Sequence, residues 1–89
     1  MKKEDLWNLD YTFAEYIYKG LKAFRKKNGS HPMGLTSELW DEILDTMVEG
    51  FRQYTLDDLE LSKKENKERI KKFNKGMKLF NKYFHDLWI

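Results

Sequence analysis

Apolar side chains recur at steps of three and four between positions 36 and 54, and this spacing constrains the fold more than any other feature of the chain. Such steps place side chains on one face of an α-helix, because successive residues turn by about 100°. Thr36 can cap this helix, and Glu38 suits the positive end of the helix dipole. The pattern predicts a helix at 37–54 whose buried face comprises Trp40, Ile43, Leu44, Met47, Phe51 and Tyr54.

Two further helices are predicted on either side of this one. The first spans 9–27 and ends where Asn28, Gly29 and Pro32 favour a turn; its apolar stripe is Leu9, Phe13, Ile17, Leu21 and Phe24. The second spans 63–88 and begins with a capping box at 62–65. Its apolar seam comprises Ile70, Phe73, Met77, Phe80, Phe84 and Leu87.

The predicted fold is therefore an all-α, three-helix domain. The segment 55–61 is compatible with a loop, a short helical turn or an early start of the last helix. Because the chain has 89 residues, of which 40% are hydrophobic, we expect one globular domain over 1–89. No run of residues is long and apolar enough to span a membrane, and the lack of cysteine suits a reducing cytosol, so we expect a cytoplasmic protein.

The first and last helices carry more apolar surface than one small core can cover. A second stripe, Trp7, Tyr11, Ala14 and Tyr18, runs beside the first on the N-terminal helix. Leu79, Tyr83 and Trp88 widen the seam of the C-terminal helix on both flanks. The surplus indicates either a homo-oligomer or an aromatic pocket, and we favour the homo-oligomer.

Charge is divided unevenly along the chain. Residues 1–31 carry seven Lys/Arg against four Asp/Glu, residues 32–61 one against eight, and residues 62–89 nine against three. A basic stripe runs along 63–88 and comprises Lys64, Lys67, Lys71, Lys75, Lys78, Lys82 and His85; an acidic stripe on 37–54 comprises Glu38, Asp41, Asp45 and Glu49. Both patterns are typical of solvated faces that attract each other weakly. The basic stripe is also compatible with a phosphate-bearing ligand.

Residue types that carry catalysis are sparse. The chain has two histidines and no cysteine, its glycines are scattered, and no His-Glu-x-x-His or Glu-x-x-His pair occurs. We therefore expect no enzyme activity, no cofactor and no metal site, and we interpret the acidic stripe as solvated. Duplex DNA is an unsuitable partner, because the acidic helix would repel its backbone and no recognition-helix pattern is present.

Three blocks of the sequence resemble small uncharacterised proteins of tailed bacteriophages and prophages. The blocks are LWNLDYTFAEYIYKGLKAF, GLTSELWDEILDTMVEGF and GMKLFNKYFHDLW, and together they cover most of the chain. Shared positions are Trp7, Asp10 and Thr12, then Trp40, Asp41, Leu44, Asp45 and Met47, then Leu79, Phe80, Tyr83, Phe84, Leu87 and Trp88. The resemblance implies a phage origin and an all-α fold, without an assigned activity.

By analogy with other small phage proteins, the resemblance favours a role against host defence. In the first hypothesis an oligomer sequesters a phosphate-bearing nucleotide signal through Trp7, Tyr11, Arg52, Lys78, Lys82, Tyr83, His85 and Trp88. In the second, the chain inhibits a host protein through its aromatic surface or through Glu38, Asp41, Asp45 and Glu49. Asp41 and Asp45 could also bond to tryptophan N–H groups or to lysines of the last helix. A structural role in the virion remains a third alternative.

Overall fold

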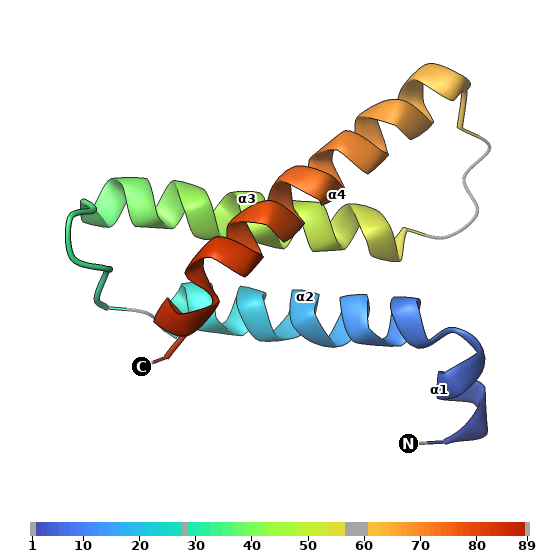
Figure 1. Cartoon of the computed structure of the whole chain (residues 1–89), viewed down its shortest axis with the longest axis horizontal. Coiled ribbons are helices and arrows are strands. Elements are labelled where there is room, and N and C mark those ends of the chain that lie inside the picture. The colour runs from blue at the N-terminus through green and yellow to red at the C-terminus, as the bar shows by residue number, and fades with distance from the viewer. Residues whose placement is uncertain (1, 28, 57–60, 89) are drawn as a thin grey trace.

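The structure, a computed structural model, describes residues 2–27, 29–56 and 61–88 and is helical throughout its regular elements. The elements are α1 (Lys3–Trp7), α2 (Leu9–Lys27), α3 (Ser37–Thr55), α4 (Lys63–Tyr83) and a 3₁₀ turn at Phe84–Asp86 (Figure 1). No strand occurs among the described residues. The all-α fold with three long helices is thus confirmed, while the short α1 is an addition that the sequence patterns did not predict.

Both predicted N-terminal caps are present. The Thr36 hydroxyl accepts a hydrogen bond from the Leu39 N–H at 3.1 Å. The Ser62 hydroxyl accepts from the Glu65 N–H at 3.1 Å, and the Glu65 carboxylate accepts from the Ser62 N–H at 3.4 Å. For the segment 55–61 the sequence is compatible with either loop or helix. In the structure Thr55 ends α3, and Leu56 and Leu61 are not helical; 57–60 lie outside the described residues.

The last helix ends earlier than its predicted limit at residue 88. After Tyr83 the backbone tightens into the 3₁₀ turn, in which the Leu87 N–H donates to the Phe84 carbonyl at 3.3 Å. Asp86 disfavours further helix here, because a negative charge is unfavourable at a helix C-terminus. The turn brings Leu87 against the core.

Helix α3 is the centre of the molecule. Helix α2 runs antiparallel beside it, and α4 crosses it obliquely (Figure 1). Both outer helices pack on α3, but among the described residues no Cα of α2 comes within 8 Å of a Cα of α4. The two outer helices therefore diverge from each other, and the fold is open between them.

The core forms on the predicted face of α3. Trp40, Leu44, Met47 and Phe51 are 0–1% exposed, and Ala14 and Leu21 of α2 complete the buried cluster. The Phe51 ring meets Phe73 and Phe80 of α4 edge-to-face, with ring centroids 5.5 and 5.3 Å apart. Because edge-to-face contact adds to the burial of apolar area, these ring contacts stabilise the packing of α4 on α3.

Helices α3 and α4 touch backbone to backbone where Gly50 meets Gly76. A Cβ atom on Gly50 would lie 2.8 Å from the Lys72 carbonyl oxygen and 2.9 Å from the Gly76 Cα, too close for any side chain. This contact decides which face of α4 is buried: the face centred on Gly76 packs on α3. Its other members are Phe73, Phe80, Tyr83 and Leu87.

The predicted seam of α4 is consequently wrong at three of its six positions. Ile70, Met77 and Phe84 are 50%, 40% and 56% exposed, whereas Leu79 and Tyr83, predicted to flank the seam, pack against the core. Helix α2 shows the same shift: Phe13 is 50% exposed, while Ala14 is buried and Tyr18 is packed. In each helix a small residue, Ala14 in α2 and Gly76 in α4, faces α3. Larger residues on the adjoining faces, such as Phe13 and Met77, are therefore exposed.

Candidate functional site

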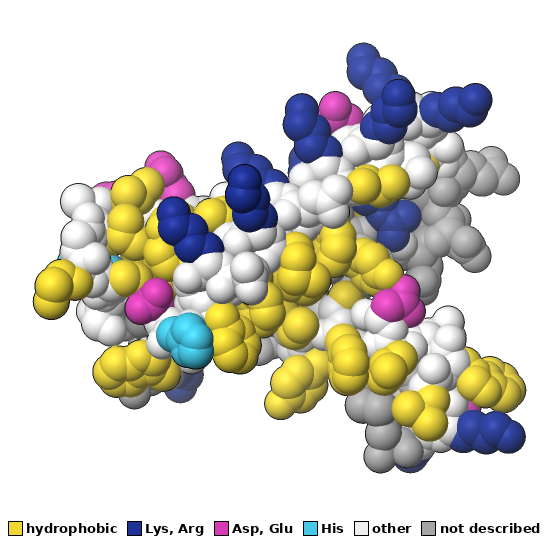
Figure 2. Space-filling model, viewed as in Figure 1, with side chains coloured by type: hydrophobic (Ala, Val, Ile, Leu, Met, Phe, Trp, Pro, Cys, Tyr) yellow, Lys and Arg dark blue, Asp and Glu magenta, His cyan; other side chains and the backbone are white. Residues whose placement is uncertain are grey.

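An apolar groove runs between α2 and α4, where the two helices diverge. Eight residues line this α2–α4 groove, which has a volume of about 320 Å³: Tyr16, Ile17, Gly20, Leu21, Phe24, Phe80, Phe84 and Leu87. None of them is charged, although 36% of the chain is. Figure 2 shows hydrophobic side chains gathered along this line, with Lys and Arg side chains on the outer edge of α4.

The total surface of the chain is large for its mass. It exposes 7076 Å², whereas a monomeric folded protein of 10.9 kDa exposes about 5,600 Å². The excess is about 1,500 Å². The radius of gyration, 14.2 Å, also exceeds the roughly 12 Å expected for 89 residues. Exposed aromatic residues contribute to the excess, with Tyr16 at 80% and Trp7 at 74%.

The acidic stripe of α3 is largely engaged within the chain. Arg25 of α2 binds both Asp45 (2.9 Å) and Asp41 (3.5 Å). The hypothesis that these two carboxylates bond to tryptophan or to the lysines of the last helix is therefore wrong. Their partner is on the first long helix, and the ion pairs fix α2 against α3.

Glu49 and Arg52 form a second engaged pair on α3. The Arg52 guanidinium donates to the two Glu49 oxygens at 2.8 and 2.9 Å, and Gln53 donates at 2.7 Å. These donors lower the pKa of Glu49 from 4.5 to about 2. Arg52, predicted to bind ligand phosphate, has its guanidinium bonded to a carboxylate instead.

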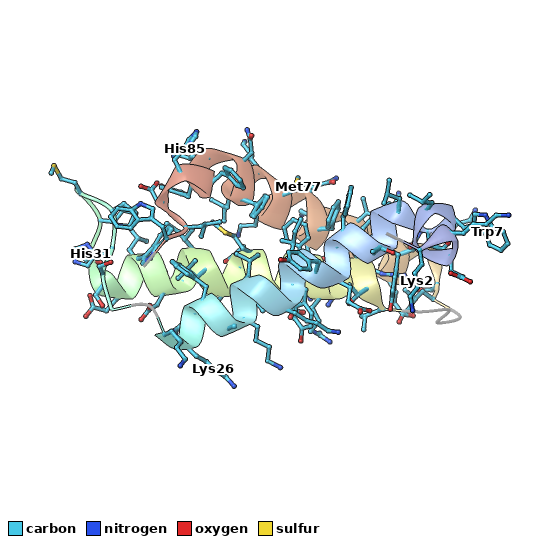
Figure 3. The ribbon with its side chains drawn as sticks, turned by 90° about the horizontal axis from the view of Figure 1, so that it is seen from below. Lys2, Trp7, Lys26, His31, Met77 and His85 are labelled. Atoms are coloured by element: carbon cyan, nitrogen blue, oxygen red, sulfur yellow. The ribbon has the colours of Figure 1, made fainter. Side chains whose placement is uncertain are left out.

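The other predicted ligand residues lie in two separate groups. Trp7 is at one end of a molecule 40 Å long, and His85 is near the other (Figure 3). Lys78, Lys82, His85 and Trp88 are exposed near the C-terminal end, and the Lys82 ammonium sits 5.3 Å from the centre of the Tyr83 ring. Tyr83 itself packs edge-to-face on Trp40. Within one chain, Trp7 and Tyr11 do not join this group.

A second cavity lies at the wide end of the opening between α2 and α4. This Asp10 cavity has a volume of about 450 Å³ and is lined by Asp10, Tyr11, Tyr54, Leu56, Asn66, Arg69, Ile70 and Phe73. The Tyr54 hydroxyl donates a hydrogen bond to the Asp10 carboxylate. That bond lowers the pKa of Asp10 and raises the pKa of Tyr54. Asp10 is therefore ionised and Tyr54 neutral at physiological pH.

Arg69 closes the inner side of this cavity. Its Nε donates to the Gln53 carbonyl at 2.6 Å, and its Nη2 donates to the carbonyls of Tyr54 and Leu56. The Gln53 carbonyl also accepts from the Leu56 N–H at 3.4 Å. The three carbonyls lie at the C-terminal end of α3, where helical donors run out, so Arg69 of α4 caps α3. The sequence patterns missed both this cap and the Tyr54–Asp10 bond, because each joins residues far apart in the chain.

No protein-family model, curated protein or solved structure matches this chain. Within the described residues, no three His, Cys, Asp or Glu side chains gather as metal ligands. No described helix has the length and hydropathy needed to cross a lipid bilayer.

Proposed function

We propose that this protein is a non-enzymatic bacteriophage accessory protein of the host cytoplasm, which acts by binding and assembles with copies of itself through the α2–α4 groove. The observation that carries the proposal is the uncharged, aromatic lining of that groove on an otherwise strongly charged chain. Large exposed apolar patches on soluble proteins commonly mark contact surfaces.

A second copy of the chain is the occupant that fits best. The surface excess of about 1,500 Å² is roughly twice the 800 Å² that each partner buries in a standard interface. A two-fold symmetric contact sets a patch against the same patch, so like charges at its centre would repel. The α2–α4 groove contains no charged residue and is therefore compatible with itself.

Native mass spectrometry at micromolar concentration tests the assembly. We expect a multiple of 10.9 kDa for the native chain and the single-chain mass for Phe84→Lys, which puts a charge into the groove. Met33→Lys is the matched control, because Met33 is fully exposed outside the groove and should leave the assembly intact. A native chain that remains single at all concentrations would contradict the proposal.

The proposed cargo is a phosphate-bearing nucleotide signal of host defence. Support comes from the exposed Lys78 and Lys82 beside Tyr83, with Trp88 72% exposed nearby. Lysines attract phosphate, and aromatic rings stack on bases. Trp7 and Tyr11 would take part only if assembly brings them from another copy.

A thermal-shift panel of cyclic dinucleotides, cyclic trinucleotides and ADP-ribose derivatives tests the cargo. A ligand at 100 times its dissociation constant adds about 2.7 kcal/mol to the free energy of unfolding. We expect Lys82→Gln to weaken this stabilisation and Lys64→Gln, at the other end of α4, to preserve it. If no compound stabilises the chain, the nucleotide hypothesis fails.

Failure of that hypothesis would favour the alternative, a host protein held by the aromatic surface. The acidic helix is a poorer docking surface than its sequence indicates, because Asp41, Asp45 and Glu49 already bind arginines of the same chain. Glu38 forms no ion pair among the described residues, so charge reversal at Glu38 tests the part of the acidic helix that is still available. A partner held by the aromatic surface should stay bound to that variant and be released by Phe84→Lys.

A further inference from the structure

Among the described residues Asp10 has no cationic partner, in contrast to four other acidic residues of the chain. Asp41, Asp45, Glu49 and Glu15 each lie within 4 Å of an arginine or lysine nitrogen. Within the described residues, no ion pair includes Asp10; its carboxylate accepts hydrogen bonds from the neutral Tyr54 hydroxyl and from the backbone N–H groups of Tyr11 and of Asp10 itself. A hydroxyl satisfies part of the carboxylate and neutralises none of its charge.

The wall around this carboxylate is aromatic. Tyr11, Tyr54 and Phe73 line the same cavity, and the Tyr54 and Phe73 ring centroids are 4.5 Å apart. The face of an aromatic ring attracts cations through its quadrupole, most strongly where water is partly excluded. A carboxylate beside several rings is the combination that recognises ammonium and guanidinium groups.

We infer that the Asp10 cavity binds a small organic cation, whose charged group lies between the Asp10 carboxylate and the rings of Tyr11, Tyr54 and Phe73. The volume, about 450 Å³, falls within the range of small-molecule sites. The side-chain amide oxygen of Asn66, which also lines the cavity, can accept a hydrogen bond from an amine. Ile70 and Leu56 supply an apolar surface for the carbon chain of the ligand.

Arg69 is the one described cation that lines this cavity, and its charge is directed elsewhere. Its Nε and Nη2 point to three main-chain carbonyls at the C-terminus of α3, where the helix dipole is negative. The dipole of α3 thus offsets part of the arginine charge, which still acts on the Tyr54 hydroxyl, and no ion pair joins Arg69 to Asp10 among the described residues. This inference goes beyond the proposed function and does not depend on it, because none of the cavity residues lines the α2–α4 groove.

Two-dimensional amide NMR of the isotope-labelled full chain tests the inference, with choline, putrescine and agmatine as probes. The matched uncharged probe is 3,3-dimethylbutan-1-ol, which has the shape of choline with carbon in place of nitrogen. We expect saturable shifts at Tyr11, Asn66 and Phe73 with one or more of the cations at millimolar concentration, and none with the alcohol. No shifts with any cation, or equal shifts with choline and the alcohol, would overturn the inference.

Two variants separate the carboxylate charge from its hydrogen bond. Asp10→Asn removes the charge, and we expect it to weaken cation binding about tenfold or more, as for other hydrogen bonds to charged groups. Tyr54→Phe removes the same hydrogen bond but keeps the charge, and we expect binding to persist. Glu42→Gln, an exposed carboxylate of α3 outside the cavity, should have no effect. Equal loss in Asp10→Asn and Tyr54→Phe would contradict a role for the charge.

Discussion

We expect Gly50→Ala to lower the free energy of unfolding by about 1–3 kcal/mol, although alanine is the better helix former. The added Cβ would lie 2.8 Å from the Lys72 carbonyl oxygen and 2.9 Å from the Gly76 Cα. Both are backbone atoms, so no side-chain rotation can relieve the contact. Helix α4 would have to move away from α3 and take the Phe51 ring contacts with it.

Urea unfolding of the native chain and of two alanine variants measures this effect. Gly29→Ala is the control, because Gly29 lies between α2 and α3, outside the α2–α4 groove, and its Cβ would meet nothing within 4 Å. We expect this control to raise the free energy of unfolding by about 0.4–1 kcal/mol, since alanine restricts the unfolded chain. If both variants were stabilised alike, the close crossing of α3 and α4 would be wrong.

The same glycine contact explains how far the sequence could predict the fold. Helix α3 was predicted almost to the residue, because its cap, its acidic first turn and its apolar stripe agree with one another. The buried face of α4 was misplaced because Gly76 has no side chain and so adds nothing to an apolar pattern. Only a partner glycine at position 50, known from the packing, shows that 76 faces inward.

The candidate sites were less predictable for a related reason. Asp10 and Tyr54 are 44 positions apart, and Arg25 and Asp45 are 20 apart. No local pattern links such residues, because which charges meet depends on how the helices pack. The sequence predicts that apolar side chains remain exposed, because the two helices carry many of them, but it misplaces most of these residues. Trp7 and Trp88 are exposed as predicted, whereas four others pack on the core: Ala14, Tyr18, Leu79 and Tyr83.

The exposed apolar surface results from the way α2 and α4 pack on α3. Each outer helix can bury only the stripe that faces α3, because α2 and α4 do not pack on each other. Side chains at the inner edges of both helices are then left on the surface, as at Phe13, Ile70 and Phe84. A closed three-helix bundle would bury these edges within one chain.

Alanine substitutions at Phe51 and Phe84 should distinguish the stability of a single chain from the stability gained by assembly. Phe51 is 1% exposed and contacts Phe73 and Phe80, so we expect Phe51→Ala to lower the free energy of unfolding by about 3–5 kcal/mol. Phe84 is 56% exposed. Within a single chain, Phe84→Ala should therefore change stability by less than about 1 kcal/mol.

Thermal unfolding over a range of protein concentrations distinguishes the two positions. The melting temperature of an assembled protein rises with concentration, because association stabilises the folded state. We expect this dependence in the native chain and its loss in Phe84→Ala, whose dilute melting temperature should match that of the native chain. Phe51→Ala should melt far lower at every concentration. Equal effects of the two substitutions would mean that Phe84 belongs to the core of one chain and that the groove has no partner.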